Sequence, residues 1–244
     1  MPRFARVCAI PLLLAAVPLS AQAEGGPWSV EGSLAVVSDY VWRGVSQSQE
    51  DPAGQFELTF SHESGFYIGT WGSTVDFTGP GDEDDGINVE VDLIVGYTHE
   101  FSDTLSLDLN AQRYFYPGAK DGYDIDFNEF TAALSFGGNY TAAITYSDDA
   151  IKLGGSSLYY SLGGEWELGD SGFTLAAGVG YYDLDDAIGE GYTDYTISLG
   201  KSVGPIDLTL WYTDTSGYNE VLADSLGASE FADGRVGLTA SWGF

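Results

Sequence analysis

Apolar and polar residues alternate along most of the chain between Trp28 and Phe244. In the clearest run, residues 87–98, a mostly aliphatic face alternates with a second face that carries Glu90 and Asp92. A period of two indicates β-strands with one apolar and one polar face, and no run shows the period of about 3.6 residues that is typical of a helix. The pattern predicts twelve strands, near residues 28–42, 56–60, 67–77, 87–97, 105–109, 130–136, 140–146, 158–166, 173–181, 195–199, 206–212 and 236–244.

The connections between the predicted strands alternate in length. Long polar segments such as 78–86 and 214–233 follow the odd-numbered strands, and short segments such as 137–139 and 202–205 follow the even-numbered ones. This alternation is typical of an outer-membrane barrel with short periplasmic turns, long external loops and both termini in the periplasm. A soluble β-sandwich also has alternating strands, but its loops need not alternate in length. We therefore predict an all-β fold, a transmembrane antiparallel β-barrel of about twelve strands.

The amino terminus has the pattern of a cleaved signal peptide. Arg3 and Arg6 precede an apolar stretch over residues 7–19, and Ala21-Gln22-Ala23 is a small-x-small cleavage site. The stretch is too short for a membrane anchor and contains two prolines. We predict a signal peptide at 1–23, a single barrel domain at 24–244 and a location in the outer membrane. The single cysteine, Cys8, is lost on cleavage, which excludes a disulfide framework and a thiol nucleophile.

The charge balance excludes nucleic acid as a partner. The chain has 37 Asp and Glu against 8 Lys and Arg, with a net charge of −29. Phosphate binding needs clustered basic side chains, and this chain has too few of them. The 44% of hydrophobic residues is too high for a disordered acidic chain, so the composition favours a folded protein.

A family resemblance rests on the segment from Ser38 to Ser48, Ser-Asp-Tyr-Val-Trp-Arg-Gly-Val-Ser-Gln-Ser, followed by Phe56 and by segments 61–67 and 73–77. These residues resemble the outer-membrane porin family called TorF-like, or Gcw_chp. The resemblance implies a secreted β-barrel of porin type and supplies no catalytic residues. The final segment, with Trp242 and Phe244, resembles the terminal strand signal read by the outer-membrane assembly machinery, although an ordinary edge strand could also end this way.

The polar faces of the predicted strands are acidic. If the aliphatic faces contact lipid, the opposite faces point into the lumen and carry ten carboxylates and two arginines: Glu31, Asp39, Glu57, Asp76, Glu90, Asp92, Asp108, Glu129, Glu165 and Asp207, with Arg43 and Arg235. Buried charges must be paired or solvated, so we expect water to reach these candidate pore-lining residues. Some could instead hydrogen-bond Ser, Thr and Tyr in a plugged lumen. Barrels of about eight strands are filled and those of about 16 to 18 are open, so the lumen is expected to be narrow.

Asp39 and Arg43 are predicted to share one face of the first strand, because they are four residues apart. Arg43 could oppose the acidic wall at the outer mouth of a pore. It could equally form a structural ion pair that holds the first loop.

Enzymatic and metal chemistry find little support in the sequence. His62 and His99 both fall in predicted periplasmic turns, so a catalytic Ser-His pair at the external rim lacks its base, and we expect no enzymatic activity and no cofactor. A weak metal candidate is the acidic loop Asp82, Glu83, Asp84 and Asp85. A solvated loop explains it as well, and a divalent ion bridging to lipopolysaccharide phosphates is a third possibility.

These patterns favour a porin-like channel for passive diffusion of small, polar or cationic solutes. The expected partners are outer-membrane lipid, lipopolysaccharide, small solutes and the assembly machinery. The alternative is a closed structural or interaction barrel whose acidic external loops bind divalent cations, lipopolysaccharide or a partner.

Overall fold

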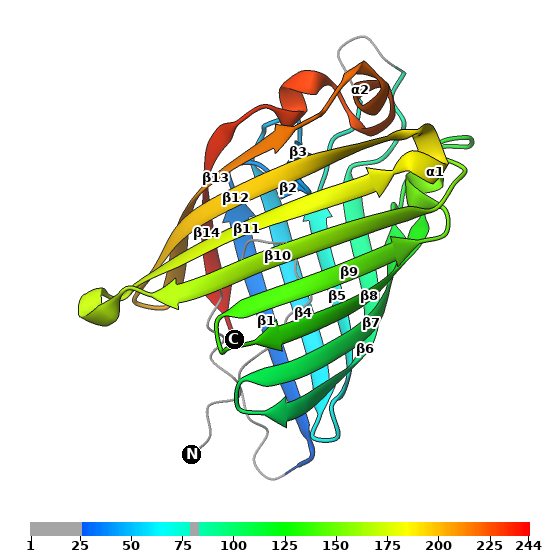
Figure 1. Ribbon diagram of the computed structural model, residues 1–244. Helices are drawn as coiled ribbons and strands as arrows, with labels where there is room; N and C mark the ends of the chain where they lie inside the picture. Colours follow the sequence, from blue (N-terminus) through cyan, green and yellow to red (C-terminus); the bar gives the residue numbers. More distant parts are fainter. Residues whose placement is uncertain (1–25, 79–82) are drawn as a thin grey trace.

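The computed structural model describes residues 26–78 and 83–244, and these form a closed twelve-stranded antiparallel barrel (Figure 1). The predicted signal peptide and Asp82 lie outside the described residues. The barrel strands are β1 (Trp28–Val37), β4 (Ala53–His62), β5 (Phe66–Thr74), β6 (Val89–Ser102), β7 (Leu105–Phe115), β8 (Phe127–Phe136), β9 (Tyr140–Ser147), β10 (Ser157–Glu167), β11 (Phe173–Leu184), β12 (Glu190–Val203), β13 (Ile206–Ser216) and β14 (Arg235–Gly243). The predicted fold class is confirmed.

The barrel closes by pairing its first strand with its last. β1 pairs with β4 on one side and with β14 on the other, from Ser33 opposite Gly243 to Val37 opposite Thr239. Gly32 and Phe244 extend this seam by two backbone hydrogen bonds of 2.9 Å. Closure satisfies the backbone of every strand within the barrel, which a hydrocarbon environment requires.

The outer surface of the barrel carries a belt of apolar side chains. These side chains are exposed along the strands, as in Leu34 and Val36 of β1, Leu93 and Val95 of β6, and Val236 of β14. Neighbouring residues of the same strands point inward, so the period of two in the sequence separates the lipid-facing belt from the lumen. In residues 26–78 and 83–244 no helix is long and apolar enough to cross a membrane.

The short turns and the longer loops lie at opposite ends of the barrel. The turns at 63–65, 103–104, 137–139 and 204–205 share one end with the start of β1 and with Phe244, because Trp28 pairs with His62 at the end of β4. The β10–β11 turn at 168–172, which contains η2 (Gly169–Ser171), lies at the same end. The opposite end, here called the loop end, carries the other connections, including α2 (Glu220–Leu226) and η3 (Ser229–Ala232). One connection at the loop end is shorter than predicted: β11 and β12 are joined by residues 185–189, which include α1 (Asp185–Ile188).

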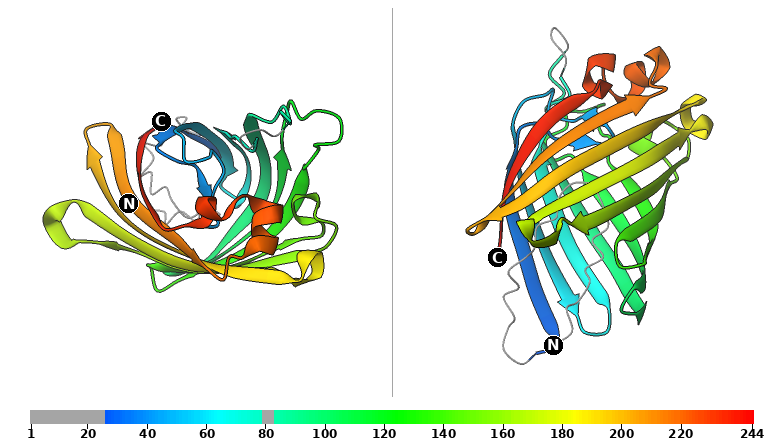
Figure 2. Two further views of the ribbon diagram at one scale, coloured as in Figure 1. Left: turned by 90° about the horizontal axis from the view of Figure 1, so that it is seen from above. Right: turned by 60° about the vertical axis from the view of Figure 1, so that its left-hand side comes forward.

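The first strand is shorter than the sequence pattern predicted. β1 ends at Val37, and residues 38–52 leave the wall and fold into the barrel (Figure 2, seen from above). We call residues 38–52 the plug hairpin; it contains β2 (Val41–Trp42) and β3 (Val45–Ser46), which pair with each other in a separate two-stranded sheet. The prediction that Asp39 and Arg43 share one face of a wall strand is therefore wrong.

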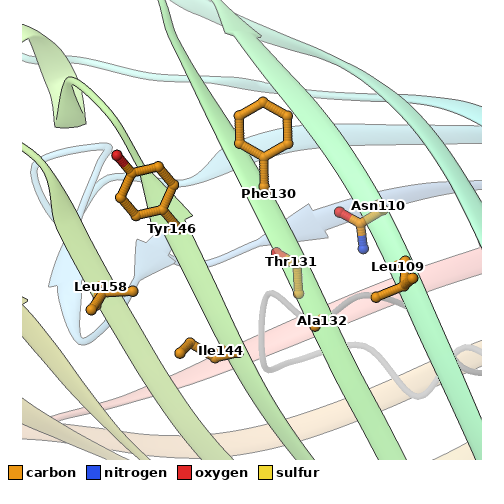
Figure 3. Close-up of a pocket in the computed structure, with 8 residues that line it drawn as sticks. All are labelled: Leu109, Asn110, Phe130, Thr131, Ala132, Ile144, Tyr146 and Leu158. Carbon is orange, nitrogen blue, oxygen red and sulfur yellow. The ribbon is translucent and has the colours of Figure 1, made fainter.

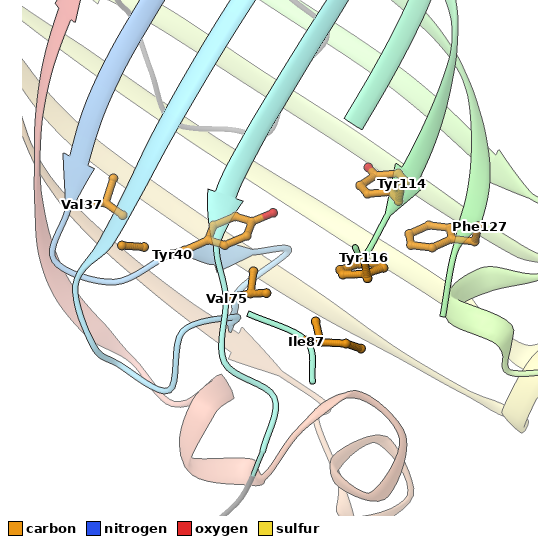
Figure 4. Packing of buried hydrophobic residues seen from close by; sticks show 8 residues of the cluster. Val37, Tyr40, Val75, Ile87, Tyr114, Tyr116 and Phe127 are labelled. Atoms are coloured by element: carbon orange, nitrogen blue, oxygen red, sulfur yellow. The ribbon is translucent and has the colours of Figure 1, made fainter. Parts of the chain in front are cut away.

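Two clusters of buried apolar side chains fill the loop end of the barrel. The first contains Val37, Tyr40, Ala53, Val75, Ile87, Tyr114, Tyr116 and Phe127 (Figure 4). The second contains Val45, Ala150, Tyr182, Leu184, Tyr192, Leu222 and Ala232. Trp42 packs against both clusters. The plug hairpin is thus built into the packing of the loop end.

Candidate functional site

Most of the twelve predicted lumen residues point into the barrel. Glu90, Asp92, Asp108 and Glu129 are buried on the inner faces of β6, β7 and β8. Asp39 and Arg43 reach the lumen from the plug hairpin, and Arg235 reaches it from the start of β14. Glu31 and Glu57 are partly buried on β1 and β4. The structure therefore brings Glu90 and Glu129 into contact with the plug hairpin, whereas Asp108 lies nearer the short turns, where it contacts Tyr67 and Thr98.

Three predicted residues lie away from this group. Asp76 follows the end of β5 and is exposed, where its carboxylate accepts a hydrogen bond of 3.0 Å from Gln49. Glu165 is exposed near the turn end of β10. Asp207, at the start of β13, accepts a hydrogen bond from Ser202. These residues are peripheral to the plugged region.

The centre of the site is a buried ion pair between the plug hairpin and the wall. Arg43 Nη2 donates to both carboxylate oxygens of Glu129, at 2.8 and 2.9 Å, and the two side chains are only 7% and 5% exposed. Tyr114 donates its hydroxyl to the same carboxylate at 3.0 Å. Both bonds come from one nitrogen, and hydrogen bonds between ionised groups are shorter and stronger than neutral ones. The sequence left two possibilities for Arg43, a cation at the mouth of a pore or a structural ion pair that holds the first loop. The contact with Glu129 is such an ion pair.

Three aromatic rings surround the guanidinium of Arg43. Its central carbon lies 4.2 Å from the ring centroid of Trp42, 4.3 Å from that of Tyr159 and 4.4 Å from that of Tyr182. Such cation–π contacts are strongest when the cation is desolvated, as it is here. Burial lowers the pKa of Arg43, but the Glu129 carboxylate raises it, and the net pKa lies above the usual value. The guanidinium therefore stays charged.

The backbone at Arg43 is held in an unusual conformation. Arg43 and Gly44 have φ angles of 50° and 81°, so both central residues of the β2–β3 turn are left-handed, as in a type I′ turn. Gly44 is required for a second reason, because a Cβ there would lie 2.6 Å from Cγ2 of Thr215. Asn, Asp or Gly normally occupies the first central position, and a left-handed residue of another type costs about 1–3 kcal/mol. The contacts of the guanidinium offset this strain.

A second ion pair holds the base of the plug hairpin. Arg235 Nη1 lies 3.1 Å from Asp39 Oδ2 and 3.1 Å from Glu50 Oε1. The other oxygen of Asp39 accepts hydrogen bonds from Ser46 at 2.6 Å and from Ser48 at 3.0 Å. The motif Ser38–Ser48 is thus explained by its structure, because its serines and aspartate build the hairpin and its arginine anchors the tip.

Carboxylates of β6 and β7 contact hydroxyl and amide groups. Glu90 accepts a hydrogen bond of 2.8 Å from Tyr40, whose pKa is raised by burial and then by Glu90 and Asp92. Asp92 Oδ2 accepts one of 2.7 Å from Gln112, whereas Oδ1 has no partner among the described residues. Asp108 is fully buried and accepts from the side chains of Tyr67, Thr98 and Asn110. Hydrogen bonding to hydroxyl and amide groups therefore accounts for part of the acidic wall.

The sequence pattern missed several inward side chains. Asp194 is buried in β12 and accepts hydrogen bonds from Tyr159 at 3.0 and 3.2 Å, but it lies just before the predicted strand. Tyr114 and Tyr182 were missed because they lie beyond the ends of the predicted strands 105–109 and 173–181. The sequence signal that could have found them is the alternation of side chains along a strand. Each tyrosine is two residues from another inward position, so it lies on the same face.

Two carboxylates of the acidic loop have partners within the protein. Asp84 pairs with Lys120 at 2.8 Å, and this contact and a backbone bond from Gly86 lower the pKa of Asp84. Asp85 is buried and accepts a 2.7 Å hydrogen bond from the amide of Ile87. No group of three or more His, Cys, Asp or Glu suited to a metal occurs within the described residues.

A groove of about 370 Å³ lies on the outer wall, across β7 to β10 (Figure 3). Its lining includes the exposed side chains of Leu109, Phe130, Ile144 and Tyr146, which belong to the apolar belt. The groove therefore faces lipid and does not belong to the lumen.

Comparisons with solved structures show the same class of fold. The KdgM porin superposes with a TM-score of 0.51 at 5% sequence identity, covering 88% of this chain and 98% of the porin. The NanC porin superposes with a TM-score of 0.51 at 13% identity, covering 87% and 97%. A further structure with a TM-score of 0.51, at 7% identity and coverage of 88% and 98%, is the KdgM porin in complex with disordered oligogalacturonate. The chain therefore has the fold of an outer-membrane porin.

The sequence itself identifies the family. Residues 21–244 match the family described as "Bacterial protein of unknown function (Gcw_chp)", and the chain belongs to this family. The Gcw_chp resemblance is confirmed, whereas the TorF-like name stays a prediction. No curated protein matches the sequence.

Proposed function

We propose that the chain is a passive outer-membrane channel for small polar or cationic solutes. The observation that supports this function best is the acidic inner face, where Glu90, Asp92, Asp108 and Glu129 lie on adjacent strands. Carboxylates in a low-dielectric wall focus a negative potential, which raises the local concentration of cations.

The expected solutes differ from the ligand named for one structural neighbour. Oligogalacturonate, present with the KdgM porin, is a polyanion. A polyanion would be repelled by the acidic wall of this chain. We therefore propose that this chain shares the channel function of the porin fold but does not pass polyanions. We also propose that it is not an enzyme.

The plug hairpin sets the size limit of the proposed channel. It crosses the loop end between two apolar clusters, so solutes must pass beside it or move it. A twelve-stranded barrel is narrow even without an inward loop. We accordingly propose a small-solute channel of low conductance.

The direct test is a conductance measurement on the purified, refolded barrel in a planar bilayer. We expect small discrete steps with a preference for cations across a salt gradient. An unfolded sample of the same protein serves as the control for detergent leaks. Silence of the folded barrel over a range of voltages and salts would contradict the channel.

The second candidate is a closed structural or interaction barrel. It is favoured by the dense packing of the plug hairpin, where Val45 is 1% and Tyr40 is 5% exposed. Its acidic loops would then bind divalent cations, lipopolysaccharide or a partner. A variant with residues 39–51 replaced by a short turn separates the two candidates: conduction by this variant alone indicates a plugged barrel.

The route to the membrane is also proposed. We propose that residues 1–23 are removed as a signal peptide, that residues 24–244 form one barrel domain, and that the assembly machinery recognises the end of β14. Amino-terminal sequencing of protein from the outer membrane should begin at Glu24.

A further inference from the structure

The residues around the guanidinium of Arg43 come mostly from the barrel wall, and they surround it as a binding site surrounds a ligand. Glu129 comes from β8, Tyr159 from β10 and Tyr182 from β11, so three separate wall strands supply the carboxylate and two of the three rings. Tyr114 of β7 orients the carboxylate. The guanidinium is not part of the wall, because the plug hairpin carries it in from a turn. We call these four wall residues the cation cage.

The chemistry of the cation cage suits a guanidinium or alkylammonium group in general. A carboxylate neutralises such a cation, and aromatic faces stabilise it after water has been removed. The exposed fractions of 7% and 5% for Arg43 and Glu129 show that water has been removed here. The cage makes no contact that only a peptide-borne arginine could satisfy.

Arg43 fills this cage imperfectly. Its backbone is left-handed, with a φ of 50°, and its Nη1 has no hydrogen-bond partner within the described part of the chain. A small organic cation would carry no backbone strain and could turn its donors toward the available acceptors. The cage is therefore able to accept a free ligand in place of Arg43.

We propose that Glu129, Tyr114, Tyr159 and Tyr182 form a binding site for small solutes that carry a guanidinium or ammonium group, and that Arg43 occupies this site when no solute is present. A solute that displaces Arg43 releases the tip of the plug hairpin, so the arginine acts as an autoinhibitory contact. The binding site stands by itself, whereas its effect on solute flow rests on the proposed channel function.

The competition predicts weak binding. Arg43 is attached to the wall at the base of the hairpin, where Arg235 and Asp39 form their ion pair, and a tethered group has a high effective concentration. A free solute must reach the millimolar range to compete. Weak binding is compatible with passage, because a tightly held solute would block the route.

A thiol reporter tests the site without measuring flow. Val45 is 1% exposed beside the turn, and the one natural cysteine, Cys8, lies in the predicted signal peptide, so Val45→Cys reports whether the hairpin is seated. In the V45C variant, millimolar methylguanidinium should raise the rate of thiol labelling relative to equal concentrations of NaCl, because it displaces Arg43. In R43A/V45C the basal rate should be higher by about thirtyfold or more, the loss expected for a desolvated cation–π contact. Methylguanidinium should lower the labelling rate of R43A/V45C, because it binds in the cation cage and returns the plug hairpin to its packed position.

Methylguanidinium should raise the labelling rate of V45C and lower that of R43A/V45C. These opposite effects are expected only if Arg43 and methylguanidinium occupy the same site. Adding Glu129→Gln to R43A/V45C removes the cage carboxylate and should abolish the protection. Gln47→Cys, half-buried on the same hairpin, replaces the reporter if V45C fails to fold. Absence of protection in R43A/V45C, or equal protection with and without Glu129, would overturn the proposal.

Bilayer recordings on the V45C and R43A variants separate this inference from the proposed function. If the channel conducts, methylguanidinium should increase the open time of the protein that retains Arg43. Silent bilayers together with the thiol signature would refute the channel and leave the binding site standing. Conducting bilayers without the thiol signature would refute the binding site alone.

Discussion

At the residue scale, Arg43 shows how a tertiary contact overrides local preference. A type I′ turn favours Asn, Asp or Gly at its first central position, and this chain has an arginine there with a φ of 50°. The strain is acceptable because the guanidinium meets a carboxylate and three rings in a desolvated place. Local strain of this kind is frequent at ligand clamps and switch regions.

We expect Glu129→Gln to destabilise the protein strongly. Removing one partner of a buried ion pair leaves the other charge uncompensated, which costs about 3–5 kcal/mol. Urea unfolding of the refolded barrel measures this loss; guanidinium salts are avoided because they resemble the proposed ligand. Lys120→Ala is the matched control, because its pair with Asp84 is exposed and worth about 0–1 kcal/mol. Equal effects of the two substitutions would show that the buried pair does not anchor the hairpin.

Glu90 and Asp92 should set the cation preference if the lumen conducts. Both side chains are 2% exposed, and they are neighbours on the inner face of β6, about 6.6 Å apart along the strand. The E90Q/D92N variant should have a lower cation preference, most clearly at about 0.01 M salt, where the Debye length is about 30 Å. The reversal potential across a salt gradient measures this. V89L/V91L, on the outer face of the same strand, should leave it unchanged, and an unchanged value in E90Q/D92N would exclude this face from the route.

At the element scale, the seam between β1 and β14 completes the barrel. Phe244 exchanges two backbone hydrogen bonds with Gly32, and its ring covers that glycine so closely that a Cβ there would lie 2.7 Å from the ring. Trp242 packs beside Phe244, with ring centroids 5.2 Å apart. The last residues therefore extend the closure beyond the final strand.

Deletion of Phe244 should impair assembly far more than deletion of Ala228, an exposed residue between α2 and η3. The reason is that the first deletion removes both hydrogen bonds of the seam and the terminal aromatic. The measurement is the fraction of protein that is folded in the outer membrane at equal expression. A similar loss for both deletions would show that the terminus is neither a seam nor an assembly signal.

The period of two predicted the barrel because the physics behind it is simple. A lipid-facing wall must be apolar outside, and alternation of side chains carries that demand into the sequence. The plug hairpin escaped prediction because Tyr40 and Trp42 continue the alternation of β1. An aromatic ring packs well against lipid and against another ring, so the pattern cannot distinguish outward from inward positions. The lumen carboxylates were predictable by type, but their partners depend on contacts between distant strands, such as Arg43 with Glu129.

At the scale of the whole molecule, the two ends of the barrel differ in structure. The loop end contains the plug hairpin, α2 and both apolar clusters, whereas the other end has short turns and the seam at Phe244. Outer-membrane barrels typically have short turns at the periplasmic end and longer loops at the external end. The autoinhibitory contact would therefore face the outside, where a solute arrives first.

Cysteine labelling on intact cells tests this orientation. Glu83, in the loop before β6, and Asp103, in the turn between β6 and β7, are both exposed acidic residues at opposite ends of one strand. Because the mature chain is predicted to lack cysteine, Glu83→Cys and Asp103→Cys each introduce a single thiol. An impermeant maleimide should label Glu83→Cys on intact cells and should label Asp103→Cys only after the outer membrane has been permeabilised. Labelling of Asp103→Cys alone on intact cells would invert the molecule, and the plug hairpin would then close the periplasmic end and control exit from the barrel instead of entry.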